Sequence, residues 1–483
     1  MHDNIVMGMA TLSTHNRIIG PGNPGAKSSA LTRFAPLLEK TPFLALPFNA
    51  ITPGVFDDFI ARAGPDRTDE AGAKRAIAKT EFTNDELAAM RQAVEPFNGS
   101  HVAVRSDECT AGGVGLWHTG FMLAKEKGTD IRVAAIANQI LQSEYSADVT
   151  AFKQRCGLPM EQHPGVMAMP VNGSLGSAEL DSRGIITTLL HANVITRFKG
   201  EEALINMGMG IGGANNRFPY TNLASGFRRI DFTELIELLT WNKPYMKGLQ
   251  RGEVVWMNDI LTQEGDPIQA AHLEFLRFIL DDPTGRLLEA LRTLTDLIAP
   301  QSLYLELAHA NLEDWAVVQC SEAALEDVTK PDMPSEEKVL IIEPEWARSN
   351  WVNPFGCYVS GRKDVMSGEV VYLDKETLAK LPELNANHRN YILIFDASTI
   401  EGFSLATSFK DYSNAAAIIF NTCDVKFNLL THLNGALREA GIVLLAGRVD
   451  KKFLQGLAKG EVAERTVTVY ANDAEEEAFV AAA

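Results

Sequence analysis

A strand, a short helix and a second strand follow one another near the carboxyl end of the chain, and this alternation favours an α/β unit. Residues 415–420 and 442–447 are continuous apolar runs of the kind found in buried strands. Between them, Thr431 is placed to cap a helix that Gly441 is suited to end. His432 therefore stands at the corner where the loop enters the helix.

The position of His432 suits a histidine that carries a negative group. Free N–H groups and the positive end of the helix dipole both stabilise an anion at the start of a helix. A neutral imidazole is also nucleophilic near pH 7. Taken alone, the local sequence favours the plainer interpretation, a helix residue that packs against the two strands.

Length and charge limit what the chain can be. With 483 residues it is too long for one typical core, so two or three domains are expected. Hydrophobic residues make up 46% and charged residues 22%, as in a soluble globular protein. The net charge of −18 argues against nucleic-acid and acidic-membrane partners, because both require a cationic surface. An anionic nucleotide would need a local basic pocket.

The sequence favours a cytoplasmic location. Five cysteines lie far apart and form no Cys-x-x-Cys pair, as expected for reduced thiols rather than disulfides or zinc ligands. The sequence contains no apolar stretch of about 18 residues, so we expect no membrane segment.

The glycine-rich turn at 20–28 is the first candidate phosphate-binding segment. It fails the P-loop pattern because Ala26 separates Gly25 from Lys27. A helix is predicted over 29–38, with Lys27 at its start. By itself, a lysine in this position is more often solvated.

A predicted strand over 101–106 leads into a second glycine-rich loop at 110–115. Backbone amides could approach a phosphate there without a side chain in the way, at Gly112, Gly113 and Gly115. Arg105, near the end of the strand, could form paired hydrogen bonds to phosphate oxygens. The alternative is a hairpin-like loop with a surface arginine.

Residues 130–230 are predicted to be rich in strands, and residues 232–299 to be mostly helical. A third glycine-rich stretch, 208–216, lacks the acidic partner that a dinucleotide motif requires. We therefore interpret it as a structural loop or as the border of a nucleotide site.

A strand hairpin is predicted over 300–320, with Glu306 on its first strand and Gln319 on its second. An acid and an amide on neighbouring strands offer the hard oxygen ligands that Mg²⁺ prefers. Exposed polar residues of a hairpin are the plainer alternative.

Together these pieces resemble the phosphoenolpyruvate synthase and pyruvate phosphate dikinase family. The resemblance rests on the turn before Lys27, the strand ending in Val104-Arg105-Ser106, the hairpin opened by Pro300-Gln301, and His432 followed by Arg438-Glu439, Gly441-Ile442 and Gly447. It implies an α/β and α+β multidomain fold. An ATP-grasp-type domain would be followed by a small β/α swivelling phosphohistidine domain.

The implied domain boundaries follow from the same resemblance. A nucleotide-binding domain of two subdomains would occupy 1–326, and a polar linker 327–345. The swivelling domain would occupy 346–465, and an acidic tail 466–483. Residues 473–483 of this tail are expected to be frayed. The phosphoenolpyruvate-binding barrel of the family does not fit after residue 460.

The resemblance also implies roles for the candidate residues. ATP would lie under the glycine loop at 110–115, Lys27 and Arg105 would grip its phosphates, and Glu306 and Gln319 would hold Mg²⁺. His432 would take a phosphoryl group from the nucleotide and pass it to an acceptor, largely through positioning and charge neutralisation. The acceptor would be a small molecule or a partner subunit. Assembly into a homo-oligomer stays open.

Two departures from the family favour a second hypothesis, a catalytically degenerate dikinase-like protein that acts as a nucleotide-binding regulatory or assembly component. Ser321 stands where the family has arginine, and a serine cannot offset phosphate charge. The glycine pair usually found before His432 is absent. A third departure, Val443 in place of a proline, is expected to alter packing alone.

Overall fold

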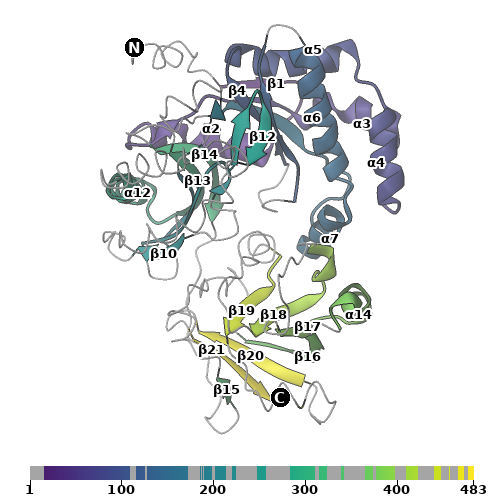
Figure 1. Cartoon of the computed structure of the whole chain (residues 1–483), viewed down its shortest axis with the longest axis vertical. Coiled ribbons are helices and arrows are strands. Elements are labelled where there is room, and N and C mark those ends of the chain that lie inside the picture. Colours follow the sequence, from purple (N-terminus) through teal and green to yellow (C-terminus); the bar gives the residue numbers. More distant parts are fainter. Residues whose placement is uncertain are drawn as a thin grey trace, which may run out of the picture.

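The chain folds as a mixed α/β protein with several sheets (Figure 1). The computed structural model describes residues 16–108, 116–125, 128–171, 185–186, 188, 190–197, 202–213, 220–224, 247–256, 283–309, 315–323, 339–341, 365–373, 377–396, 409–421, 440–447, 456, 466–472 and 477–482. Over these residues the strands form four sheets.

The first sheet runs in the order β1 (Arg17–Ile19), β3 (Asn49–Ile51), β6 (Gly165–Pro170), β4 (His101–Asp107) and β5 (Thr119–Leu123). Four helices contribute side chains to the core of this sheet: α3 (Asp57–Ala63), α4 (Glu70–Lys79), α5 (Asn84–Val94) and α6 (Thr129–Ser143). The buried faces of α5 and α6 share one apolar core with the sheet. Short 3-10 turns at Pro53–Val55 and Glu95–Phe97 complete the connections.

The second sheet runs in the order β10 (Tyr220–Ala224), β9 (Ala203–Met209), β8 (Leu190–Thr196), β13 (Ser302–His309), β14 (Trp315–Ala323) and β2 (Leu44–Ala45). Its core includes side chains of α2 (Ala26–Leu38) and α12 (Pro283–Ile298). Strands β13 and β14 pair with Glu306 opposite Gln319, and the pairing register shifts between Glu306 and Leu307. Bulges of this kind re-aim side chains, and they often lie next to functional sites.

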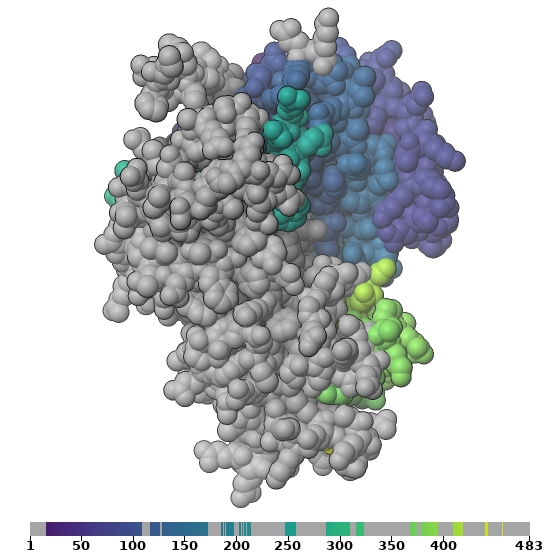
Figure 2. All heavy atoms as spheres, in the orientation of Figure 1, coloured from purple at the N-terminus to yellow at the C-terminus, as the bar shows by residue number. Residues whose placement is uncertain are grey.

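A third, small sheet contains β12 (Glu253–Trp256), β11 (Lys247–Gln250) and β7 (Ile185–Ile186). Arg251 and Gly252 connect β11 to β12 with φ angles of 53° and 85°, a left-handed pair typical of tight hairpins. A Cβ on Gly252 would collide with the backbone of Met122 and Leu123, so the hairpin turn fits closely against β5. Figure 2 shows the hairpin, in teal, at the surface of the molecule beside the blue helices.

The fourth sheet runs in the order β15 (Val339–Ile341), β21 (Glu477–Ala482), β20 (Thr466–Asn472), β16 (Val365–Leu373), β17 (Tyr391–Asp396), β18 (Ala415–Asn421) and β19 (Val443–Gly447). Strands β16 to β19 are parallel, and the remaining pairs are antiparallel. Helical turns accompany it at Leu378–Lys380, α14 (Leu381–Asn387) and η8 (Phe409–Asp411).

Helix α7 (Ala147–Cys156) lies between the upper part of the molecule and the fourth sheet in Figure 1. Its Phe152 belongs to the apolar core of the fourth sheet. Its contacts with that part of the chain include an edge-to-face ring pair of Phe152 and Phe409 at 5.6 Å and a hydrogen bond of 2.9 Å from Lys410 N to Asp148 Oδ1. Arg155 also donates to the carbonyl oxygens of Ala440 at 3.2 Å and Ala415 at 3.1 Å.

A buried carboxylate anchors the other side of α7. The Glu144 side chain is 1% exposed, and it accepts hydrogen bonds from Lys153 of α7, from Arg67 at 2.5 Å and from Trp117 Nε1 at 2.9 Å. The Lys153 side chain is itself only 7% exposed. Glu144 therefore holds two cations and an indole together in an interior where an unpaired charge would be costly.

Several predicted strands are confirmed, among them 101–106, the hairpin at 300–320, 415–420 and 442–447. Residues 130–230, predicted to be rich in strands, do contain β6 to β10. The part up to Cys156 is different, because it forms α6 and α7. Helical spacing explains α6, because its buried residues recur three and four apart, at Val133, Ala134, Ile136, Ala137, Ile140 and Leu141.

Two further expectations are corrected. Within 232–299, predicted to be mostly helical, residues 247–256 form the hairpin of β11 and β12, whereas α12 is confirmed. The tail at 473–483, expected to be frayed, contributes β21, which pairs with β20. None of the helices in the described part of the chain is long and apolar enough to cross a membrane.

Candidate functional site

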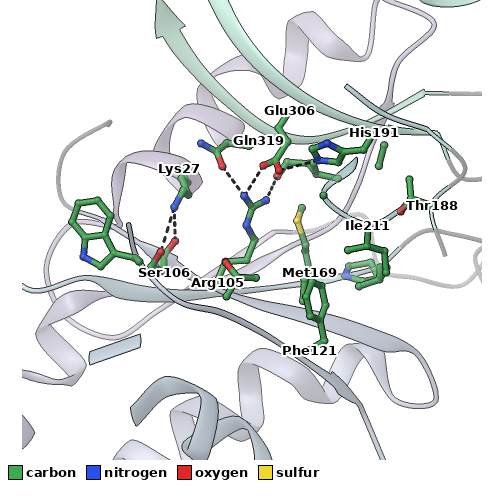
Figure 3. A pocket seen from close by; sticks show the side chains of 18 of the residues that line it. Lys27, Arg105, Ser106, Phe121, Met169, Thr188, His191, Ile211, Glu306 and Gln319 are labelled. Carbon is green, nitrogen blue, oxygen red and sulfur yellow. Dashed lines mark hydrogen bonds and ion pairs between the residues drawn. The ribbon is translucent and has the colours of Figure 1, made fainter. Parts of the chain in front are cut away.

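A cavity of about 400 Å³ lies between the first two sheets, with α2 and the β11 strand also on its wall. Figure 3 shows its side chains converging from these elements. Among the residues that line it are Lys27, Arg105, Ser106, Glu108, Trp117, Phe121, Met169, His191, Ile211, Lys247, Glu306, Gln319 and Ser321. Many of its polar groups gather around Lys27 and Arg105, and a third cation, Lys247 of β11, also lines it.

The centre of the cavity is occupied by the guanidinium group of Arg105. Its Nη2 donates to Glu306 Oε2 at 2.6 Å and to Gln319 Oε1 at 2.7 Å, and its Nη1 donates to the Val318 carbonyl oxygen at 3.1 Å. His191 Nε2 lies 3.0 Å from the second oxygen of Glu306. Strand pairing explains the cluster, because β13 lies between β14 and β8 in the second sheet.

The Glu306 carboxyl is ionised in this setting. Burial alone would raise its pKa, but the positive charge of Arg105 and the hydrogen bond with His191 hold the pKa well below its usual range. The Arg105 and Glu306 side chains are each 13% exposed, so water screens their attraction weakly.

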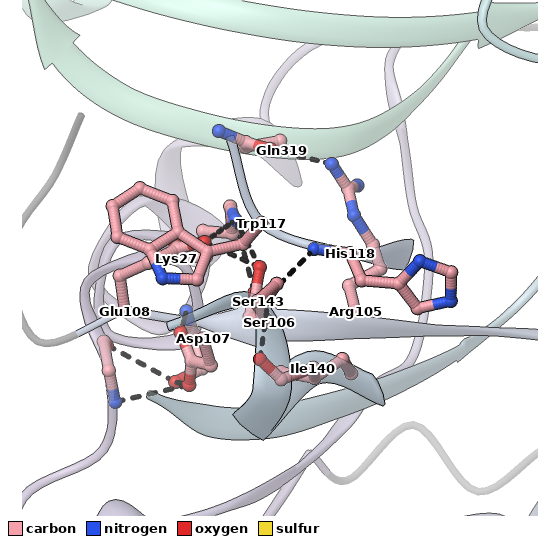
Figure 4. Close-up of polar contacts among 12 residues, drawn as sticks. Lys27, Arg105, Ser106, Asp107, Glu108, Trp117, His118, Ile140, Ser143 and Gln319 are labelled. Carbon is pink, nitrogen blue, oxygen red and sulfur yellow. Dashed lines mark hydrogen bonds and ion pairs between the residues drawn. The ribbon is translucent and has the colours of Figure 1, made fainter. Parts of the chain in front are cut away.

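Lys27 forms the second charged cluster. Its Nζ donates to Glu108 Oε1 at 2.6 Å, to the Ser106 carbonyl oxygen at 3.0 Å and to Ser106 Oγ at 3.4 Å. The Ser106 hydroxyl in turn donates to Glu108 Oε1 at 2.5 Å. Figure 4 shows these groups beside the ring of Trp117. Lys27 is therefore part of a polar network on the cavity wall.

Asp107 takes up backbone amides at the turn before Lys27 that a P-loop would offer to a phosphate. Its buried carboxylate accepts hydrogen bonds from Gly25 N and Ser28 N, both at 3.1 Å, and from the Ser28 hydroxyl. The buried Asp107 side chain therefore occupies N-terminal amides of α2, where a phosphate would otherwise bind. A Cβ on Gly25 would collide with Asp107, so this close approach requires glycine.

The cavity also has an apolar end. Met169, Phe121 and Ile211 lie on the far side of Arg105 from Lys27 (Figure 3). Lys247, whose carbonyl oxygen accepts from Ile211 N at 3.2 Å, also lines the cavity. A cavity with charged pairs around Lys27 and Arg105 and apolar side chains beyond them suits an amphipathic ligand, such as a nucleotide with its phosphates and base.

The structure brings four predicted site residues together, namely Lys27, Arg105, Glu306 and Gln319. Ser321 lines the same cavity, as does Ile211 of the third glycine-rich stretch. Gly112, Gly113, Gly115 and His432 lie outside the described residues. The roles assigned to these residues remain predictions.

Sequence reasoning missed His191, Glu108 and Trp117. His191 reaches Glu306 only because β8 pairs with β13, more than a hundred residues further on. Glu108 follows the strand of Arg105 closely, but its pairing with Lys27 spans 81 positions. The signal available in the sequence was an acidic residue, Glu108, three positions after Arg105.

The predicted magnesium ligands, Glu306 and Gln319, would suit an Mg²⁺ ion that also takes oxygen ligands from a bound phosphate. Glu306 Oε2 and Gln319 Oε1 both contact one nitrogen of Arg105, so the two oxygens converge on one point. In the described part of the chain, no group of three or more His, Cys, Asp or Glu side chains is placed to hold a metal. One carboxylate and one amide suit Mg²⁺ when phosphates supply further oxygens.

Comparisons with known proteins give weak likenesses. No family model matches the chain, and neither does any curated protein. A structure of ACD1 from Ca. Korarchaeum cryptofilum in complex with coenzyme A aligns at 12% identity over 52% of this chain and 90% of that chain, with a TM-score of 0.22.

A second structure from the same organism is a dinucleotide forming acetyl-coenzyme A synthetase 1 with a phosphorylated phosphohistidine segment, in complex with coenzyme A and acetyl-coenzyme A. It aligns at 11% identity over 61% of this chain and 97% of that chain, with a TM-score of 0.20. Neither neighbour is a phosphoenolpyruvate synthase. Likenesses of this size assign neither a family nor an activity to the chain.

Proposed function

We propose that the cavity binds ATP together with Mg²⁺ and that a phosphoryl group passes from the nucleotide to His432 and then to an acceptor. The supporting observation is the convergence of Lys27, Arg105, Glu306 and Gln319 on one cavity. The resemblance selected these four from three separated stretches of sequence. An ATP-grasp-type domain and a swivelling phosphohistidine domain are the corresponding fold proposal.

The proposed roles follow from the chemistry of each end of the cavity. Lys27 and Arg105 bind phosphate oxygens, and Met169, Phe121 and Ile211 contact the base. Bound Mg²⁺ supplies further positive charge at the phosphates, held by Glu306 and Gln319. Arg105 must then turn from Glu306 towards the phosphates, because its donors now contact protein oxygens.

The acceptor belongs to one of two classes in this proposal. It is a small molecule bound by the chain, or it is a group carried by a partner subunit.

Replacing His432 by alanine is expected to abolish phosphoryl transfer to the protein. The purified chain is incubated with Mg²⁺ and ATP labelled at the β or the γ phosphate, and the products are separated under alkaline conditions. Wild-type protein should carry an acid-labile, alkali-stable label, because a phosphoramidate at a histidine has this stability. The position of the label distinguishes dikinase from kinase chemistry.

His388→Ala provides a matched control, because this histidine lies in the described part of the fourth-sheet region and hydrogen-bonds to Glu369. It should keep the label. Equal labelling of wild type and His432→Ala would contradict the role of His432. A folded wild type that acquires no label, even with candidate partners added, would contradict phosphotransfer.

A degenerate nucleotide-binding protein is the second candidate function, and Ser321 is the observation that favours it. Ser321 lines the cavity two positions after Gln319, on the same strand. An arginine there would add a cation close to Arg105, whereas the serine adds none. Loss of this cation weakens charge neutralisation during transfer more than it weakens binding of the apolar base.

Ser321→Arg is expected to tighten binding of a non-hydrolysable ATP analogue with Mg²⁺ by about tenfold, the effect of one added hydrogen bond between charged groups. Calorimetric titration measures this change. Ser321→Gln introduces a long side chain without charge and should leave the affinity close to wild type. Equal affinities of the two variants would show that position 321 does not face the phosphates.

A further inference from the structure

The carboxylate of Glu108 lies where it competes with any phosphate for Lys27. Glu108 is 5% exposed, and its Oε1 accepts from Lys27 Nζ at 2.6 Å. A lysine ammonium group has three N–H donors. Glu108 and the two Ser106 oxygens provide three acceptors around Nζ, so a phosphate oxygen must displace one of them.

The same pairing of cation with carboxylate recurs at Arg105. Glu306 neutralises the guanidinium group just as Glu108 neutralises Lys27. A metal-free polyphosphate that enters the cavity beside Lys27 and Arg105 therefore approaches two buried carboxylates, and these two cations are already paired with them. The third cation of the lining, Lys247, comes from β11, next to Ile211. Like charges in a site of low dielectric constant repel strongly, whereas a divalent cation entering with the phosphates offsets this repulsion.

From this arrangement we propose that Glu108 is a specificity-determining residue, which makes the cavity accept a polyphosphate only as its complex with a divalent cation. The inference rests on the proposed nucleotide role of the cavity and extends it to the form of the ligand. Glu108 is suited to this role because the hydrogen bond from Lys27 Nζ does not require a charged acceptor. A neutral amide at position 108 could still accept the same hydrogen bond.

The experiment is a calorimetric titration with the non-hydrolysable ATP analogue AMP-PNP, once with excess EDTA and once with excess Mg²⁺. Wild-type protein should bind the metal-free analogue at least about tenfold more weakly than the Mg²⁺ complex, because of the repulsion. Glu108→Gln should bind the metal-free analogue about tenfold more tightly than wild type. The difference in affinity between the Mg²⁺ complex and the metal-free analogue should therefore become smaller. Glu108→Asp keeps the charge and should keep most of the wild-type ratio.

Glu86→Gln is the matched control, because Glu86 is also buried and paired with an arginine, Arg62, but does not line the cavity. It should keep the wild-type ratio. Should Glu108→Gln not fold, Glu108→Ala removes the same charge and is expected to narrow the ratio in the same way.

Two outcomes separate this inference from the function on which it rests. An unchanged ratio in Glu108→Gln, with binding of the Mg²⁺ complex intact, overturns the role of Glu108 and leaves the nucleotide site standing. Absence of AMP-PNP binding by every folded variant in both conditions overturns the nucleotide site, and the inference with it.

Discussion

Arg105→Met is expected to lower the free energy of unfolding by about 3–5 kcal/mol, because it leaves the buried carboxylate of Glu306 without its counter-ion. His191 remains as a hydrogen-bond partner of Glu306, but the charged partner that holds the Glu306 pKa low is lost. Urea unfolding followed by circular dichroism measures the change.

Two further variants test this explanation. Adding Glu306→Gln to Arg105→Met removes the unpaired charge and should recover a large part of the loss. Arg33→Met breaks an ion pair with Glu322 whose side chains are 55% and 52% exposed, and it should change stability by less than about 1 kcal/mol. Equal losses at Arg105 and Arg33 would contradict the argument from burial.

The same pair predicts a pH dependence. The folded-state pKa of Glu306 lies below its ordinary value of 4.5, so the stability that the ion pair contributes is present above about pH 4.5. It is lost progressively as the pH falls below that value. Arg105→Met should therefore lose the part of the acid sensitivity that comes from Glu306.

Glu144→Gln is expected to cost a similar amount, about 3–5 kcal/mol, because Lys153 and Arg67 would be left close together without their shared counter-ion. Thermal and urea unfolding measure the loss. Glu70→Gln is the matched control, since Glu70 pairs with Lys74 at side-chain exposures near 38%. It should cost at most about 0.5 kcal/mol. A small loss at both positions would contradict the buried network around Glu144.

Local patterns predicted the elements of the site better than its contacts. The hairpin placed Glu306 and Gln319 on neighbouring strands, and their direct opposition follows from that pairing. The contact of Arg105 with this hairpin spans more than two hundred residues, and it depends on how two sheets face each other. Neither residue propensity nor hydrophobic periodicity predicts that Arg105 meets this hairpin. The grouping of Arg105 with Glu306 and Gln319 came from the resemblance to a family.

The errors have local causes. In α6 the helical spacing was present in the sequence, but the β-branched residues Val133, Ile136 and Ile140 also suit strands. In the hairpin of β11 and β12, the turn signal was a single glycine, Gly252, within a segment dominated by helical patterns.

Helix α7 has a consequence for a chain cut by a protease between residues 326 and 339. Phe152, Asp148 and Arg155 come from the part before such a cut, but they contact the part after it. Their contacts need no covalent connection through the cut. The two fragments are therefore expected to elute together from a sizing column under native conditions, and to separate only when a denaturant is present.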